Sequence, residues 1–305
     1  MRRRVFLKTV GVAAAMSGLA SGTGVASVVA KTTEKNDGHG KPRLLVGCCA
    51  YSYAKYFEAG KITMEDFFRK AVELEVRGVD VTTYWLKSTE PEYLNSLRHL
   101  AFKNGLGFSG AAIRTEMCQS DPAKRAGQVQ NIQHWTDATD RLGASHLRVF
   151  TGDIPPGATA EQGIKWVVEV MKPVCEYAGQ RGITVGIEDH HGLTARAAEI
   201  VEIMRQLDSP YAGINLDVSN FEAPTDEQMY SDIAACIPYA THVHIRDHFE
   251  SSGHPIDLDR VWQMFAGGGY RGYMSVEYEG EEDAMTGVPK LVETVKALCH
   301  KYSSV

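Results

Sequence analysis

Four residues of the 305-residue chain have the types and spacing of ligands for a divalent cation. All of them stand near the end of a short run of β-branched or apolar residues: Glu188, Asp217, His244 and Glu277. Burying carboxylates without partners is unfavourable, because burial can shift a pKa by about 3 units, and carboxylates close together also repel one another. A divalent cation removes both penalties, and carboxylates with one imidazole suit Mn²⁺, Mg²⁺ or Zn²⁺. We therefore expect one divalent ion at this set.

The alternation within these runs predicts that the four side chains point the same way. Successive side chains of a strand face opposite sides, so Asp217 opposes Leu216 and His244 opposes Ile245. The two glutamates alternate with apolar neighbours in the same manner. Any one of these charges could belong to a structural ion pair, but four at equivalent depths in successive strands favour a shared site.

The elements that must position these residues alternate along the chain. Eight runs are expected to be strands: 44–47, 79–82, 108–113, 146–150, 183–188, 212–217, 241–246 and 273–278. Helical patterns separate them, and their starts carry capping residues: Thr63 with Asp66, Asp121 before Pro122, Thr159 with Gln162, and Thr225 with Gln228. Glycines precede five of the strands, where the turn out of a helix favours a left-handed residue: Gly78, Gly105, Gly143, Gly182 and Gly272.

Eight strands, each followed by a helix, predict a single-domain (β/α)8 TIM barrel over residues 44–305. A doubly wound open sheet is the rival architecture, and it would carry a glycine-rich phosphate loop after its first strand. Residues 48–53 follow the first expected strand and read CCAYSY, which is no such loop. In a barrel the active site lies at the C-terminal ends of the strands, where the four expected metal ligands stand.

The segments around these ligands resemble those of a known family. They read IEDHHG at 187–192, GINLDVSNF at 213–221, HVHIRD at 242–247 and GYRGYMSVEYE at 269–279. They are similar to the E-x-H, D-x-x-N, H-x-K/R-D and G-Y-x-G-x-x-x-x-E segments of the sugar phosphate isomerase/epimerase superfamily, which has a xylose isomerase-like TIM barrel. The resemblance covers about residues 44–300. It implies a metal ion held by the four residues above, with His190 close to the substrate.

Further side chains near this site are expected to bind substrate: His190, Arg148, Asn220, Arg246, His242 and Trp85. Arg148 either holds a substrate oxygen or forms a salt bridge at the barrel rim. Trp85 either stacks on a sugar ring or packs within the protein, and His242 either touches ligand or forms hydrogen bonds behind it. Ketose 3-epimerases of the superfamily have an arginine six residues after the metal histidine and a histidine three after the metal aspartate. This chain has Glu250 and Asn220 there, which separates it from that subgroup.

Several functions are compatible with these residues. The first is a metal-dependent isomerase or epimerase, in which Glu188 and Glu277 exchange the proton beside a carbonyl of a sugar or keto-sugar. The second is a lyase or dehydratase that acts on a keto-sugar, a 3-keto-glycoside or an inositol derivative. Two other readings fit less well: a phosphodiesterase resembling AP endonucleases, and a sugar-binding module without catalysis. The formal net charge of −6 argues against a nucleic acid partner, because proteins that grip DNA concentrate positive charge.

The N-terminal segment has the layout of an export signal. Residues 2–8 read RRRVFLK and precede a mildly apolar stretch rich in Ala, Gly, Ser and Val. This order resembles a twin-arginine signal over residues 1–30, which implies the twin-arginine machinery as a partner and the periplasm as the destination. Few Leu or Ile residues occur in the stretch, so we expect no stable membrane anchor. Residues 31–43 are expected to form a flexible tether.

Overall fold

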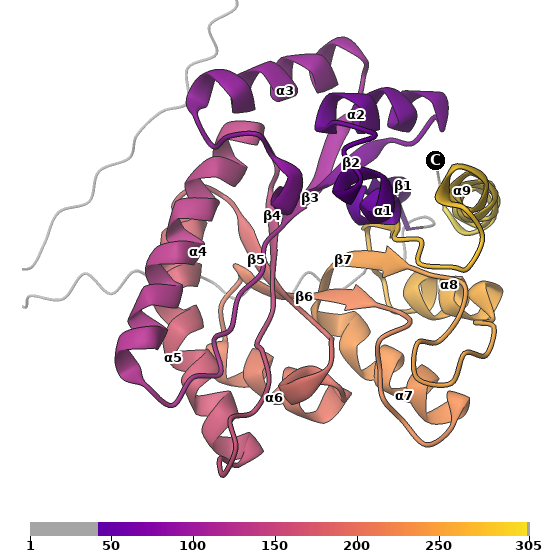
Figure 1. The fold of residues 1–305 in the computed structure, drawn as a ribbon. Coiled ribbons are helices and arrows are strands. Elements are labelled where there is room, and N and C mark those ends of the chain that lie inside the picture. Colours follow the sequence, from indigo (N-terminus) through magenta and orange to yellow (C-terminus); the bar gives the residue numbers. More distant parts are fainter. Residues whose placement is uncertain (1–41, 304–305) are drawn as a thin grey trace, which may run out of the picture. The chain divides into compact units, whose positions relative to one another are not determined.

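The computed structural model describes residues 42–303, and in it eight parallel strands close into a barrel (Figure 1). The strands are β1 (Leu44–Cys49), β2 (Gly78–Thr82), β3 (Gly107–Ala112), β4 (His146–Val149), β5 (Thr184–Glu188), β6 (Ala212–Asp217), β7 (Ala240–Ile245) and β8 (Gly272–Val276). Each pairs in parallel with its neighbours, and β8 returns to pair with β1. The predicted (β/α)8 barrel is confirmed, and no predicted strand end is displaced by more than two residues. The expected signal and most of the expected tether lie outside the described residues.

Helices follow the strands around the outside of this barrel (Figure 1). They are α1 (Ala54–Glu58), α2 (Met64–Glu73), α3 (Pro91–Lys103), α4 (Pro122–Leu142), α5 (Ala160–Gly179), α6 (Ala197–Leu207), α7 (Asp226–Cys236), α8 (Leu258–Gly267) and α9 (Ala284–Tyr302). The predicted starts are confirmed. Thr63 and Thr159 form capping boxes, and Asp121 and Thr225 accept hydrogen bonds from the first turns of α4 and α7. None of the helices within residues 42–303 is both long enough and apolar enough to cross a membrane.

Two predicted glycine roles are wrong. Gly105, Gly143 and Gly182 do have left-handed φ angles before their strands, but Gly78 and Gly272 instead begin β2 and β8. The left-handed residue after α2 is Glu75, with φ of 55°. Gly78 is small for a different reason, because a Cβ there would lie 2.5 Å from the ring of Tyr273. Close packing across the barrel, and not turn conformation, therefore requires glycine at this position.

The strands divide their side chains between two environments. Apolar residues such as Ile187, Leu216 and Val243 are fully buried in the hydrophobic core shared by barrel and helices. The barrel interior holds polar side chains, with the Oγ of Ser275 3.2 Å from that of Ser109. The six cysteines are all buried, and none of them forms a disulfide. A polar interior beneath the C-terminal strand ends is well suited to support ionisable groups.

Candidate metal centre and active-site cavity

The barrel brings the four expected ligands together. Each offers one ligand atom, and these atoms all lie within 4.8 Å of one another: Glu188 from β5, Asp217 from β6, His244 from β7 and Glu277 directly after β8. None of the four is more than 3% exposed. Parallel strands end at the same edge of the barrel, so residues 89 positions apart in the chain become neighbours. The structure thus brings together the four side chains that the sequence predicts to share one site.

The donors fit a single divalent cation. The Nδ1 atom of His244 lies 3.1 Å from Oε2 of Glu277 and 3.8 Å from Oε2 of Glu188. Oδ2 of Asp217 is buried, and Nε of Arg246 lies 3.1 Å from it. Three buried carboxylates beside an imidazole nitrogen are the donor set of a hard or borderline metal ion. The cluster can therefore hold one metal ion.

Arg246 supplies positive charge at the edge of this cluster. Its guanidinium lies 3.1 Å from Asp217, 3.4 Å from Glu277 and 2.7 Å from Glu279. A further ion pair at 3.1 Å joins it to Glu250, the residue that replaces the arginine of ketose 3-epimerases. Expected from the sequence to bind substrate, Arg246 lines the cavity and is also the cation that the acidic residues share.

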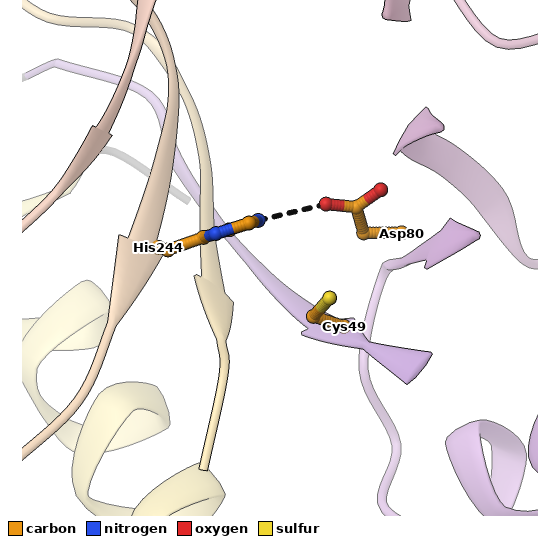
Figure 2. Close-up of side chains that lie close together, drawn as sticks. All are labelled: Cys49, Asp80 and His244. Atoms are coloured by element: carbon orange, nitrogen blue, oxygen red, sulfur yellow. Dashed lines mark hydrogen bonds and ion pairs between the residues drawn. The ribbon is translucent and has the colours of Figure 1, made fainter. Parts of the chain in front are cut away.

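Asp80 supports His244 from the far side of the ring, and sequence reasoning missed it. Figure 2 shows Asp80 and Cys49 reaching toward His244 from strands on the other side of the barrel. The Nε2 atom of His244 lies 2.8 Å from Oδ2 of Asp80. A signal was available, because Asp80 is the one acidic residue in the otherwise apolar run Gly-Val-Asp-Val, where alternation places it inside the barrel.

Cys49 completes this supporting layer as a neutral thiol. Its Sγ donates to Oε1 of Glu277 at 3.4 Å. Cys49, Asp80 and His244 could by geometry alone hold a metal ion. Burial, with the nearby charges of Glu277 and Asp80, raises the pKa of the Cys49 thiol, so it is a poor thiolate ligand. Cys49 and Asp80 are better explained as supporting residues that orient the ligands Glu277 and His244.

Asn215 and His242 form a second support beneath the cluster. Asn215 donates from Nδ2 to Oε2 of Glu188 at 3.1 Å, and its Oδ1 accepts from Nδ1 of His242 at 2.7 Å. The other ring nitrogen of His242 lies 3.0 Å from the hydroxyl oxygen of Ser275. Burial lowers the pKa of His242 to about 4, which keeps the ring neutral. Of the two sequence-based alternatives for His242, the structure places it behind the site and away from the cavity wall.

The two glutamates differ in their affinity for protons. Burial raises the pKa of Glu188 to about 7, although the neighbouring Arg148 opposes this. Burial acts in the same direction on Glu277, but the charges of His244 and Arg246 outweigh it and hold the pKa of Glu277 well below its usual range. Burial also raises the pKa of Asp217 to about 6. A pair of carboxyl groups whose pKa values are pushed apart is typical of an acid and base pair.

A cavity of about 400 Å³ opens above these residues. Glu188 and Glu277 reach its floor, and the predicted residues Arg148, His190 and Arg246 line it. Further lining residues come from the loops after β1 to β4, and they include Tyr51, Tyr84, Arg114 and Thr115. The volume and the mixture of aromatic rings with hydrogen-bonding groups are typical of a small-molecule site.

Arg148 and His190 hold different positions on this wall. Arg148 forms a buried ion pair with Glu188, Nε to Oε2 at 2.9 Å, and its guanidinium stacks on the ring of Phe150. Arg148 therefore forms a salt bridge, which was one of its two predicted roles. This salt bridge lies in the active-site cavity and not at the barrel rim. His190 packs against Phe150 with ring centroids 4.6 Å apart, and burial lowers its pKa to about 4. A neutral imidazole facing the cavity can either donate or accept a hydrogen bond.

Trp85 and Asn220 do not line this cavity. Trp85 stacks on Phe57 with ring centroids 4.6 Å apart, which matches the packing alternative, while its neighbour Tyr84 faces the cavity. Asn220 donates from Nδ2 to Oε1 of Glu188 at 3.4 Å and lines a neighbouring hollow. Both residues thus lie near the site, and neither forms part of the cavity wall.

Comparison with known proteins agrees with this geometry. The family model described as xylose isomerase-like TIM barrel matches residues 68–298, so the chain belongs to that family. No curated protein sequence matches the chain at a significant level.

Solved structures show the same barrel at low sequence identity. A xylose isomerase domain protein from Planctomyces limnophilus is 16% identical, with a TM-score of 0.66 over 86% of this chain and 99% of that one. D-psicose 3-epimerase from Clostridium cellulolyticum H10, solved with D-tagatose, is 15% identical, with a TM-score of 0.69 over 85% and 99%. The 3-keto-D-glucoside 4-epimerase from E. coli is 18% identical, with a TM-score of 0.64 over 84% and 100%. At these identities the likeness establishes the fold alone.

Proposed function

We propose that this member of the xylose isomerase-like TIM barrel family is a metal-dependent isomerase or epimerase of sugars or keto-sugars. The observation that carries this proposal is the pair of buried glutamates, Glu188 and Glu277, which both line one cavity. Both lie beside Nδ1 of His244, one from β5 and one from directly after β8. Such a pair can remove a proton from one side of a bound molecule and return it from the other.

The residues of the chain divide the work of proton transfer. Glu277 is ionised and can accept the proton from the carbon beside a carbonyl, whose oxygen takes up the electron pair. Glu188 lines the same cavity and can return a proton to carbon. Return to the same carbon gives an epimer. Return to the former carbonyl carbon gives an isomer when the proton of the neighbouring hydroxyl passes to the enolate oxygen, so that a new carbonyl forms at the neighbouring carbon.

A divalent cation bound by Glu188, Asp217, His244 and Glu277 would polarise the carbonyl and its neighbouring hydroxyl, which lowers the barrier to proton removal. Arg148 holds the Glu188 carboxylate through its ion pair. Asp80 fixes the position of His244 through its contact with Nε2. Asn215 fixes the position of Glu188 through its hydrogen bond to Oε2. The polar cavity wall supplies donors and acceptors for hydroxyl groups.

The choice of a sugar is supported by relatives of the same fold. Two of the similar solved structures are named as epimerases of D-psicose and of 3-keto-D-glucosides. The cavity of this chain combines Tyr51 and Tyr84 with ionic and hydroxyl groups, which suits a ring that is apolar on its faces and polar at its edges.

An experiment in deuterated water tests the proposal. The Mn²⁺-loaded protein is incubated in buffered D₂O with free ketoses, keto-sugars and 3-keto-glycosides, and the recovered sugars are analysed by NMR and mass spectrometry. Deuterium at the carbon beside the carbonyl, in an epimerised, isomerised or unchanged sugar, supports proton transfer. A released aglycone or an unsaturated product would instead establish the lyase alternative. No change in any sugar would contradict both.

We also propose that residues 1–30 direct export by the twin-arginine route. The support is the order Arg3-Arg4-Val5-Phe6-Leu7-Lys8 before a weakly apolar, glycine-containing stretch. Export in the folded state would allow the metal to be inserted before the protein leaves the cytoplasm.

A further inference from the structure

A second hollow adjoins the active-site cavity. It has a volume of about 510 Å³, and we call it the side bay; its wall includes His190, His191, Asn220, Ala223, Glu250 and Ser251. Three of these residues, His190, His191 and Glu250, also line the active-site cavity. Each hollow lies within the range of roughly 300–1,000 Å³ in which proteins enclose small ligands. A molecule in the active-site cavity therefore has a second compartment beside it.

The wall of the side bay is held by contacts between three loops. The amide of Glu222 donates to the carbonyl of Ala195 at 2.9 Å, which joins the loops after β6 and β5. The amide of Glu250 donates to the carbonyl of Ser219 at 3.1 Å, which joins the loops after β7 and β6. The hydroxyl of Ser251 adds a bond to the carbonyl of Phe221 at 3.1 Å. Together these bonds join the three loops that enclose the bay.

A buried acceptor in the bay has no partner. Asn220 is 5% exposed, and its Nδ2 group donates to Oε1 of Glu188 and to the carbonyl of Asp189. Its Oδ1 atom makes no hydrogen bond to any described residue. Buried acceptors in native proteins nearly always have a donor, so a bound molecule with a hydroxyl group can complete the hydrogen bonding of this oxygen. The same side chain touches Glu188, which connects the bay to the reacting centre.

The charges around the bay favour an uncharged ligand. Arg196 lines it, but its guanidinium is already paired with Asp232 at 2.6 Å. Glu222 and Glu250 add negative charge. Among the described residues of this wall, no Lys or Arg is left unpaired to receive a phosphate or a carboxylate. A neutral hydroxyl group can donate a hydrogen bond to Oδ1 of Asn220 without electrostatic repulsion from Glu222 and Glu250.

We infer that the substrate is a glycoside of two ring-sized parts, with the reacting sugar above Glu188 and Glu277 and an uncharged, hydroxylated ring in the side bay. The inference rests on the proposed function for the position of the reacting ring. The Oδ1 atom of Asn220 accepts a hydroxyl of the second ring. His190, which lines both hollows, lies where the two rings join.

Titration calorimetry with the Mn²⁺-loaded full chain tests this directly. The ligands are glucose, galactose, cellobiose, maltose and lactose, together with the 3-keto forms of these sugars. At least one disaccharide should bind about tenfold more tightly than its own monosaccharide, a difference of about 1.4 kcal/mol. Ala223→Trp places a bulky ring in the bay and should remove that tenfold advantage. Ala234→Trp, on the exposed face of α7, is the matched control and should retain it.

Failure of this inference is distinguishable from failure of the proposed function. Monosaccharides that bind and exchange deuterium, with no disaccharide binding more tightly, would overturn the two-ring substrate and leave the reaction standing. A disaccharide that binds in an Ala223-dependent manner, with no proton exchange in any sugar, would support the bay and overturn the reaction. No binding of any sugar would overturn both. If Ala223→Trp does not fold, Glu222→Trp fills the same bay from an exposed position and takes its place.

Discussion

His244 is held at both ring nitrogens, with Nε2 lying 2.8 Å from Oδ2 of Asp80 and Nδ1 lying 3.1 Å from Oε2 of Glu277. A proton on Nε2 donated to Asp80 leaves the Nδ1 lone pair directed at the acidic cluster. Histidines that bind metals usually have such a carboxylate behind them, which fixes the tautomer and the ring orientation. Asp80 does not line the cavity and is therefore a positioning residue for the metal centre.

Asp80→Asn should lower the affinity for Mn²⁺ about 10–100-fold, as is typical when such a supporting carboxylate is lost. At saturating Mn²⁺ the turnover number should fall much less, because Glu188 and Glu277 are intact. The measurement is calorimetric titration of Mn²⁺ together with turnover at increasing Mn²⁺. Asp137→Asn is the control, since that carboxylate pairs with Arg181 on the surface. Equal metal affinity in Asp80→Asn and in the wild type would contradict the positioning role.

About one divalent ion should be bound per chain, and Asp217→Ala or His244→Ala should lose it. Both residues contribute ligand atoms to the cluster, and neither transfers protons in the proposed mechanism. Elemental analysis of freshly purified protein gives the stoichiometry, and circular dichroism checks that the barrel survives. A metal-free protein that also shows no activation by added Mn²⁺, Mg²⁺, Zn²⁺ or Co²⁺ would refute metal dependence.

Metal affinity should rise as the pH increases from about 5.5 to 7.5. Burial raises the pKa of Glu188 to about 7 and that of Asp217 to about 6, so a cation must displace protons that these ligands hold at lower pH. The stability of the metal-free protein has the opposite pH dependence, because these two carboxyl groups make it less stable as the pH rises. A carboxyl group whose folded pKa is raised stabilises the fold below its unfolded pKa and loses that contribution as the pH rises through the folded value.

Thermal unfolding with and without Mn²⁺ across this pH range measures both effects. The rise in Tm on adding Mn²⁺ should become larger as the pH increases. Over the same range the two carboxyl groups should lower the Tm of the metal-free protein. A rise in Tm that is the same at pH 5.5 and 7.5 would show that the ligands are already deprotonated at the lower pH.

The double variant Arg3→Lys, Arg4→Lys should remain in the cytoplasm, because the twin-arginine resemblance depends on this pair. Cell fractionation and immunoblotting measure the outcome in a host with an active twin-arginine pathway. Arg2→Lys alone, which leaves the pair intact, is the matched control. Accumulation of the double variant in the periplasm at the wild-type level would rule out this route.

The barrel could be predicted from the sequence because local signals agree with the global fold. Thr63, Asp121, Thr159 and Thr225 mark helix starts, and alternation along 212–217 and 241–246 places Asp217 and His244 inside. The closing pair of strands, β1 with β8, follows from the strand count and is confirmed by their parallel register.

The supporting contacts could not be predicted, because they join residues that are far apart in the chain. The bond between Asp80 and His244 spans 164 positions, and neither residue alone identifies the other as its partner. Trp85 follows the second strand as Tyr84 does, yet only Tyr84 faces the cavity, since Phe57 holds the indole ring by stacking. Side-chain direction in such a short turn depends on tertiary packing.

Proton exchange in Glu188→Gln and Glu277→Gln, each at saturating Mn²⁺, tests the central claim most directly. Glutamine keeps the size and one oxygen ligand but removes the basic oxygen, and general acid–base assistance is typically worth about 10²–10⁴-fold. With Glu176→Gln on the exposed face of α5 as the control, both variants should lose about that factor in deuterium incorporation from D₂O into the sugar. Near-wild-type exchange in both variants, with metal binding restored, would contradict the two-glutamate mechanism and place the base elsewhere, with His190 the first residue to examine.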